Sequence, residues 1–356
     1  MVAEKLHRWL EWAAQAGASD LHIVVGHPPV IRLHGDLAEL PDAALAPDEI
    51  EPLLLSVCPE DAAQRLQSNK NADFSFECPL AGKRARFRAT LFLASGDAGG
   101  CFRLIPDAIP DLAWAGFPAD LAAKIVGLRD GLVIVTGATG SGKSTTLAML
   151  VNRMNALGGY RIITVEEPVE YRFPRAANSL VTQREVGADV LSFADGLKYG
   201  LRQDPDVILV GEVRDRETAQ MALSAAETGH LVFSTLHTRD AKGAITRLPD
   251  LFPTDAQSAI RSQLAMSLRA IVSQRLLPSV QKNEKRHLAL EVMWNTHPVA
   301  SAIRQNKIES IDNCILTGRD EGMWTCDESV RVLFRAGKIS RAVAEQNVRD
   351  VKYLGH

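Results

Sequence analysis

The sequence predicts an α/β domain with a mostly parallel sheet, preceded by a smaller α+β domain. From about residue 112 onward, strand and helix patterns alternate at the spacing of βαβ units, with strands expected at 132–136, 161–166, 207–210 and 231–235. Residues 1–105 combine short helical stretches with alternating strands, which is typical of a small α+β domain. The proline-containing stretch 106–111 indicates a linker, so the second domain covers 112–356 and is expected to end in a mostly helical tail.

The clearest motif is a phosphate-binding loop directly after the predicted strand 132–136. It fits the pattern G-x-x-x-x-G-K-[ST] and consists of Gly137, Ala138, Thr139, Gly140, Ser141, Gly142, Lys143, Ser144 and Thr145. A glycine loop between a strand and a helix aims backbone N–H groups and the positive helix end at a phosphate. We expect Lys143 to reach the β- and γ-phosphates and the Ser144 hydroxyl to bind Mg²⁺. A glycine-rich turn with a chance lysine is disfavoured, because apolar residues at helical spacing follow the loop.

Composition excludes several classes of protein. The chain is 46% hydrophobic and 23% charged with a net charge of -3, which argues against a dedicated nucleic-acid binder. No apolar run approaches the roughly 18 residues of a membrane span, and Glu4, Arg8 and Glu11 interrupt any signal-peptide core. The five cysteines are scattered without a C-x-x-C pair, which indicates free thiols in a reducing cytosol.

Two groups of acidic residues follow predicted strands. Glu166, Glu167 and Glu170 end or follow the strand at 161–166, and Glu212 follows the strand at 207–210 after Gly211. The carboxyl ends of parallel strands surround the ligand crevice, where such acids can bind Mg²⁺ or orient the attacking water. For the first group, ordinary surface acid at a strand end is an equal alternative. For Glu212 it is the weaker alternative, because an apolar strand ending in an acid is typical of the metal and water motif of P-loop NTPases.

Histidines and arginines complete the candidate residues. His230 and His237 lie at opposite ends of the strand expected at 231–235; either could sense the γ-phosphate while the other ties this strand to a neighbour. Arg86 and Arg88 are two residues apart on a predicted strand and therefore share a face. On the residues alone, solvated charges are the favoured interpretation of both. An arginine supplied by another domain or subunit can nevertheless stabilise transition-state charge in phosphoryl transfer, and Arg103 is a third candidate.

Taken together, these motifs resemble the secretion-ATPase superfamily, specifically the type IV pilus retraction motors of the PilT/PilU type. The resemblance covers nearly the whole chain, and its motifs run in the family's order at 18–22, 137–145, 165–170, 204–215 and 228–238. They correspond to an N-terminal signature, the Walker A loop, the "Asp box", the Walker B segment and the "His box". In the tail, the sequence Ala-Ile-Arg-Gln-Asn-Lys at 302–307 resembles the AIRAGK element associated with retraction motors.

The resemblance implies a PAS-like N-terminal domain joined to a RecA-like ATPase domain in a homo-hexameric ring. Such a ring uses ATP and Mg²⁺, acts at the cytoplasmic face of the inner membrane on a pilus platform protein, and associates only peripherally with the membrane. It implies roles for Glu212 as the catalytic carboxylate, for Glu166 in holding metal and water, and for His230 near the γ-phosphate. Candidates for the arginines that complete the site are Arg86, Arg88 and Arg103.

The sequence departs from the retraction-motor pattern at several positions. Glu167 replaces the aspartate that names its box, Ala138 replaces a frequent proline, and Gln305-Asn306 replace the Ala-Gly of the AIRAGK element. A weakly active PilU-like accessory subunit that couples to a paralogous motor therefore stays an alternative, as does a type II secretion or pilus-assembly ATPase. Extension motors are disfavoured because their four-cysteine zinc motif is missing, and a small-molecule kinase because no acceptor-substrate motif is visible.

Overall fold

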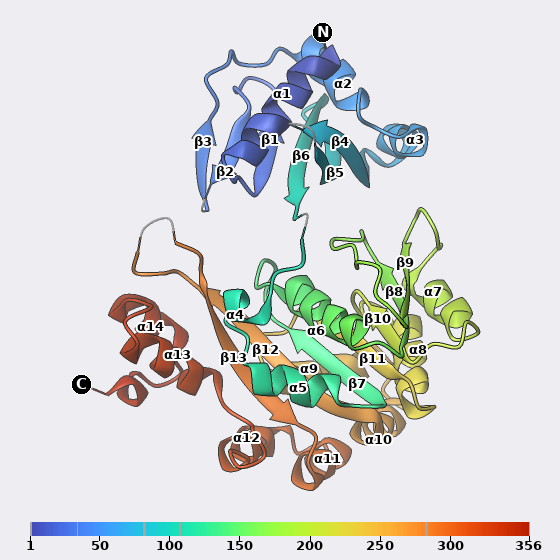
Figure 1. Ribbon diagram of the computed structural model, residues 1–356, viewed down its shortest axis with the longest axis vertical. Coiled ribbons are helices and arrows are strands. Elements are labelled where there is room, and N and C mark those ends of the chain that lie inside the picture. Colours follow the sequence, from blue (N-terminus) through green and yellow to red (C-terminus); the bar gives the residue numbers. More distant parts are fainter. Residues whose placement is uncertain (1, 34, 81–82, 107, 282–283, 356) are drawn as a thin grey trace. The chain divides into compact units, whose positions relative to one another are not determined.

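The first sheet is antiparallel and belongs to the N-terminal part of the chain. The computed structural model describes residues 2–33, 35–80, 83–106, 108–281 and 284–355, and the chain divides into two units, Met1–Ala108 and Ile109–His356 (Figure 1). Residue 107 of the expected linker lies outside the described residues. Within the first unit, the strand order is β3-β2-β1-β6-β5-β4. The strands are β1 (Asp20–Ile23), β2 (Val30–Leu33), β3 (Asp36–Glu39), β4 (Asn71–Leu80), β5 (Lys83–Ala94) and β6 (Asp97–Ile105).

Helices α1 (Val2–Gln15), α2 (Pro47–Leu55) and α3 (Glu60–Asn69) accompany this sheet. The apolar face of α1 is built from residues three or four apart, and all of them are buried: Leu6, Trp9, Leu10 and Ala13. Their burial places them in one core with the alternate, inward-facing strand residues, such as Leu21, Phe87 and Phe102. The alternate side chains of the same strands point to the other face of the sheet, where polar residues can lie.

The second sheet carries the phosphate-binding loop. Its order is β13-β12-β7-β11-β10-β8-β9, with parallel neighbours throughout except for the antiparallel pair β12–β13. The strands are β7 (Gly131–Thr136), β8 (Arg161–Glu166), β9 (Leu180–Glu185), β10 (Val207–Val210), β11 (Leu231–Leu236), β12 (Leu268–Leu277) and β13 (His287–Trp294). Every residue of β7, β10 and β11 is buried, as expected for parallel strands covered on both faces.

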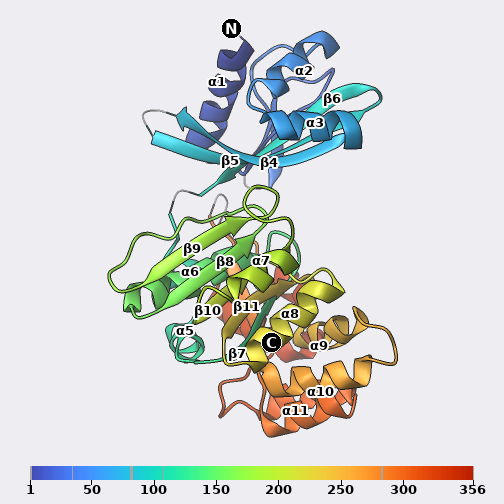
Figure 2. The ribbon, with the colours of Figure 1, turned by 90° about the vertical axis from the view of Figure 1, so that its right-hand side faces the viewer.

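Helices cover both faces of this sheet (Figures 1 and 2). Because parallel crossovers are right-handed, α6 lies on one face with α5, whereas α7, α8, α9 and α10 lie on the other. Their bounds are α5 (Ala119–Val126), α6 (Lys143–Leu157), α7 (Phe193–Gly200), α8 (Arg216–Glu227), α9 (Ala241–Asp250) and α10 (Gln257–Ser267), after the short α4 (Leu112–Ala115). Within the described residues, no helix is both long and apolar enough to cross a membrane.

The expectation of a mostly helical tail is wrong for its first half. After α10, β12 inserts beside β7 and β13 pairs with it, so the sheet extends beyond the four predicted strands. Most of β12 is buried, and such a run lacks the alternation that distinguishes a strand from a buried helix. The rest of the tail is helical: α11 (His297–Arg304), η1 (Ile308–Ser310), α12 (Ile311–Thr317), α13 (Cys326–Arg335), α14 (Arg341–Asn347) and η2 (Val351–Leu354).

Candidate functional site

One edge of the second sheet brings together several of the predicted site residues. Register pairs Thr136 with Leu236, and Val210 with both Ser234 and Val165, so β7, β8, β10 and β11 end at the same edge. The segments that leave these strands contain the glycine loop, Glu166, Glu212 and His237. The topology therefore brings together motifs that are separated by up to about a hundred residues in sequence.

The loop between β7 and α6 has a backbone that demands glycine. Gly137, Gly140 and Gly142 have φ values of +151°, +75° and +88°, which L side chains rarely adopt. A Cβ atom on Gly137 would lie 2.4 Å from the carbonyl oxygen of Gln274 on β12. The Gln274 side chain also donates from Nε2 to the Ser141 carbonyl oxygen at 2.6 Å. Strand β12 thus supports the loop from behind and fixes its curvature.

Lys143 is the first residue of α6, and its side chain folds back into the loop. Its Nζ donates to the carbonyl oxygens of Gly137 at 2.9 Å and Ala138 at 3.2 Å, and the residue is only 8% exposed. Burial lowers the pKa of the Lys143 ammonium, whereas the nearby carboxylates of Glu212 and Glu170 oppose that shift. The ammonium therefore lies among loop carbonyls, between the cradle and the acids.

Two hydroxyl groups of the loop bear on whether phosphates and Mg²⁺ fit here. Ser141 Oγ is buried and has no hydrogen-bond partner among the described residues, so a polar group is available inside the cradle. Ser144 is exposed at the first turn of α6. By contrast, Thr145 Oγ1 lies 2.9 Å from the hydroxyl of Tyr171 and faces the interior. A phosphate chain with its Mg²⁺ fits the cradle and the Ser144 side of the loop.

Glu212 lies two residues beyond the end of β10, with its side chain 12% exposed. Its Oε2 is 3.3 Å from Nε2 of His237, and its Oε1 forms an ion pair with Arg214. Arg214 also reaches Glu167, where Nη1 is 3.0 Å from Oε2. Two partners, His237 and Arg214, thus contact the two oxygens of the Glu212 carboxylate, and Arg214 links it to Glu167.

Glu166 ends β8 in a much drier environment. Its Oε1 accepts hydrogen bonds from Thr164 Oγ1 at 2.6 Å and from Gln183 Nε2 at 3.2 Å. Burial nevertheless dominates and raises the pKa of the Glu166 carboxyl to about 7. The group therefore changes charge near neutral pH, which an exposed glutamate would not do.

Exchanging Glu166 for Gln is expected to change how stability depends on pH. The folded-state pKa of about 7 lies above the ordinary 4.5, so the folded protein holds the extra proton between these values and loses stability as pH rises through them. A glutamine keeps the shape and the acceptor without the charge. Urea denaturation should show nearly equal stability of the two proteins at about pH 4 and an advantage of Glu166→Gln of up to about 3 kcal/mol at pH 8. A constant difference across this range would contradict the assignment.

The structure does not bring His230 to this edge of the sheet. Its carbonyl oxygen accepts from the N–H of Gly131, the first residue of β7, and its Nδ1 lies 3.0 Å from the carbonyl oxygen of Ala225. The six residues of β11 lie between His230 and His237. At the rise of a strand, these six residues span about 20 Å. Within this unit His230 therefore lies at the opposite end of β11 from the loop, and His237 lies beside Glu212; a contact of His230 with the γ-phosphate stays a prediction.

Comparison with known proteins agrees with this geometry. Residues 73–340 match the Type II/IV secretion system protein family. The chain belongs to this family. The type IV pilus retraction ATPase PilT of Pseudomonas aeruginosa is 38% identical over 340 residues, covering 96% of this chain and 97% of that protein. The type IV pilus ATPase PilU of the same organism is 35% identical over 340 residues, covering 96% and 87%.

A solved structure of the secretion family extends the likeness to the fold. The crystal structure of the pilus retraction motor PilT with bound ADP is 40% identical to this chain, with a TM-score of 0.84 and 97% of both chains covered. The predicted RecA-like α/β fold with an additional α+β domain is confirmed by this likeness. That PilT structure holds a nucleotide, as expected for a family with this glycine loop.

In this member of the secretion family, the three candidate arginines lie on the N-terminal sheet. Arg88 pairs in register with Arg103, and Arg86 is two residues from Arg88, so all three share one face. Arg103 donates from Nε to Oδ1 of the buried Asp20 at 2.8 Å. They belong to a different unit from the phosphate loop, so their contribution to its chemistry is a proposal and not an observed contact.

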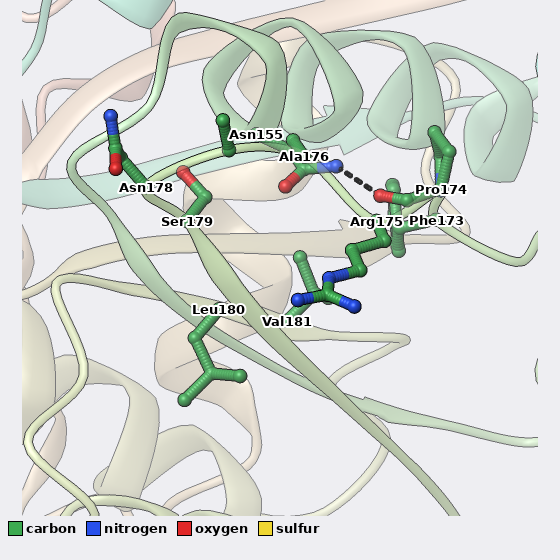
Figure 3. Close-up of a pocket in the computed structure, with 10 residues that line it drawn as sticks. Asn155, Phe173, Pro174, Arg175, Ala176, Asn178, Ser179, Leu180 and Val181 are labelled. Carbon is green, nitrogen blue, oxygen red and sulfur yellow. Dashed lines mark hydrogen bonds between the residues drawn. The ribbon is translucent and has the colours of Figure 1, made fainter.

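A pocket elsewhere in the secretion-family fold differs in chemistry from the phosphate loop. It measures about 790 Å³ and is lined by Asn155 and the segment 173–181 (Figure 3). Asn155 lies twelve residues beyond Lys143 in α6, about 18 Å along the helix. In Figure 3 its amide points to the Pro174 carbonyl, a hydrogen bond of 2.8 Å. No carboxylate lines this pocket, in contrast to the edge that holds Glu166 and Glu212.

Proposed function

We propose that this chain is an ATP-hydrolysing motor that powers type IV pilus retraction. The observation that carries the proposal is one sheet edge on which the glycine loop lies beside the Glu212–His237 pair. Near full-length likeness to PilT supports the same activity. A P-loop with an acid on a neighbouring strand end is the arrangement that positions a phosphate chain and a water for in-line attack.

Each group at this edge has a task in that chemistry. The loop amides and Lys143 would hold the phosphates, and Ser144 with Glu166 and Glu212 would hold the Mg²⁺ that neutralises their charge. Glu212 orients the attacking water and accepts its proton. His237 and Arg214 bind the two oxygens of Glu212 and so fix its direction. Preorganised polar groups of this kind lower the barrier because they need no reorientation during the reaction.

The N-terminal sheet supplies the remaining positive charge in this proposal. The side chains of Arg88 and Arg103 are 34% and 56% exposed, against 12% for Arg86, so the first two are better placed to meet an anion. The buried carboxylate of Asp20 orients Arg103. Guanidinium groups suit phosphate oxygens because they donate two parallel hydrogen bonds. A change of conformation during the ATP cycle would convert turnover into motion.

The two histidines provide a test within one strand. His237→Ala should lower kcat for ATP about tenfold, because Glu212 loses one of the groups that orient it, with KM changed less than twofold. His230→Ala should stay within twofold of the wild type, since that side chain lies at the far end of β11. Steady-state ATPase assays of both variants decide between them. The reverse ranking would restore His230 as the phosphate-sensing residue.

The assembly is likewise a proposal, based on the resemblance to retraction motors. Six copies would form a ring at the cytoplasmic face of the inner membrane, act on a pilus platform protein and drive pilus disassembly. The decisive experiment combines Mg²⁺-dependent ATP turnover by the purified chain with restoration of twitching motility in a piliated host that lacks its retraction ATPase. Turnover without restored motility in any piliated host tested would contradict retraction as the function.

A PilU-like accessory role is the second candidate. One observation favours it: Gln305-Asn306 interrupt the AIRAGK-like element at the end of α11, and the chain is similar to PilU as well as to PilT. An accessory subunit should restore motility only when a paralogous motor is also present. Co-expression of the chain with and without a PilT-type partner therefore distinguishes the two roles.

A further inference from the structure

Arg349, in the segment between α14 and η2, joins several parts of the second unit. Its Nη1 is 2.9 Å from Oδ1 of Asp312 on α12, and its Nη2 is 3.5 Å from Oδ2 of Asp240. The same Nη2 lies 4.0 Å from Oε2 of Glu291 on β13. Its backbone N–H donates to both carboxylate oxygens of Asp327 at 3.2 and 3.3 Å. One guanidinium thus holds three carboxylates from separate elements together.

Two of these carboxylates fix the beginning of α9. Asp240 caps the helix, with Oδ1 accepting from the N–H of Gly243 at 2.7 Å. Glu291, only 4% exposed, accepts the N–H of Ala241 through Oε1 at 2.9 Å. Burial raises the pKa of the Glu291 carboxyl, although the Ala241 N–H and Arg349 oppose that shift. Both acids therefore point at the first turn of α9 and at Arg349.

The beginning of α9 is connected to the phosphate loop through Thr238. Thr238 Oγ1 donates to the carbonyl oxygen of Asp240 at 3.3 Å, and its N–H donates to Thr136 Oγ1 at 3.0 Å. Thr136 is the last residue of β7, directly before Gly137. His237, which contacts Glu212, is the neighbour of Thr238 in the chain. Contacts therefore run without a break from the C-terminal segment to both the loop and the acid.

We propose that Arg349 is a positioning residue for ATP hydrolysis, which holds the segment 237–241 so that His237 orients Glu212. The proposal rests on the ATP site proposed above. It also gives the C-terminal segment a means of control: when Arg349 leaves its partners, Asp240, Glu291 and Asp312 repel one another, and the start of α9 moves away from β13. Docking of the tail and turnover of ATP are then coupled.

The positive charges near Asp240, Glu291 and Asp312 indicate why we expect the loss of ATP turnover to be specific to Arg349. Among the described residues, Lys242 also forms an ion pair with one of these three carboxylates: it reaches Asp312 at 3.9 Å and pairs as well with Glu309 on η1. Arg349 is 54% exposed, so it fills no core position, and its removal leaves no cavity. Its role is therefore carried by charge and hydrogen bonding and not by packing in the core.

The test compares Arg349→Gln with a matched variant, Arg341→Gln, in the full chain. Arg341 lies in the same tail and is 57% exposed, and its recorded ion pair joins Glu345 within α14. We expect Arg349→Gln to lower kcat for ATP about tenfold with KM within twofold, whereas Arg341→Gln matches the wild type. Arg349→Lys should recover part of the loss, because it restores the charge but not the planar fork.

A double-mutant cycle shows whether Arg349 acts through Asp240. Asparagine still caps a helix, so Asp240→Asn removes the ion pair and keeps the cap. If the proposal is right, the double variant Arg349→Gln/Asp240→Asn loses no more activity than Arg349→Gln alone. The proposal is overturned if the fold losses in kcat of the two single variants multiply in the double variant. It is also overturned if Arg349→Gln has the same kcat as Arg341→Gln. A wrong assignment of the ATP site would give a different result. The wild-type protein would then show either no ATP turnover or a turnover that Lys143→Ala does not lower.

Discussion

Exchanging Glu212 for Gln is expected to lower kcat for ATP hydrolysis by about 100-fold or more. Glutamine has the size of the carboxylate and can accept from His237 but cannot take a proton from the attacking water. Because the loop amides, Lys143, Ser144 and Glu166 would still hold the phosphates and the Mg²⁺, and the glutamine keeps an oxygen at this position, ATP affinity should stay within a fewfold of the wild type. Steady-state kinetics and titration with a fluorescent ATP analogue measure the two quantities separately.

A matched acid on the next helix provides the control for Glu212→Gln. Glu217 is exposed in the first turn of α8, five residues further along the chain. Its exchange for Gln removes the same charge without touching the loop edge, and turnover should stay at the wild-type rate. A Glu212→Gln protein with wild-type kcat would show that another group activates the water. Glu166, with its pKa near 7, would then be the first candidate.

Exchanging Lys143 for Ala is expected to abolish detectable turnover and to weaken ATP binding by about 100-fold or more. Charge-assisted hydrogen bonds contribute about 1.5–3 kcal/mol each, and Lys143 would make at least one to a phosphate oxygen. The variant should still fold, because Nζ donates only to the Gly137 and Ala138 carbonyls at the loop. Calorimetric titration with ATP and a thermal melt of the same sample measure both effects.

Lys198 on α7 gives the matching control for Lys143→Ala. It is exposed and lies over the ring of Tyr199, with 5.7 Å from Nζ to the ring centroid. Lys198→Ala should bind and hydrolyse ATP like the wild type. Robust Mg²⁺-dependent hydrolysis by Lys143→Ala, at a melting temperature equal to that of the wild type, would contradict the assignment of the loop as the nucleotide site.

Local sequence was sufficient where one element defines the chemistry. The loop at 137–145 needs a strand before it and a helix after it, and all three are contiguous in the chain. The four parallel strands were predictable because each is a short apolar run bounded by turn residues, and Glu212 because it follows one of them after a single glycine.

Residues that depend on distant contacts were not predictable in this way. Which histidine belongs to the site follows from strand direction: β11 runs parallel to β7, so only the residue after its carboxyl end reaches the loop. The support of the loop by Gln274 requires β12 to pair with β7, and the buried run of β12 gives no periodic signal. Arg349 is 109 residues from Asp240 in sequence, and no local pattern links them.

The hairpin of β12 and β13 has a mechanical consequence. Ser273 pairs in register with Glu291, and the next pair is Gln274 with Leu290. Gln274, which binds the phosphate loop, and Glu291, which binds the first turn of α9, therefore belong to adjacent register pairs of this hairpin. A force that displaces this hairpin would therefore change both the phosphate loop, which would hold the nucleotide, and the segment 237–241, which would orient Glu212 for hydrolysis. In such a motor, mechanical force would change ATP binding and hydrolysis without a further structural element to couple them.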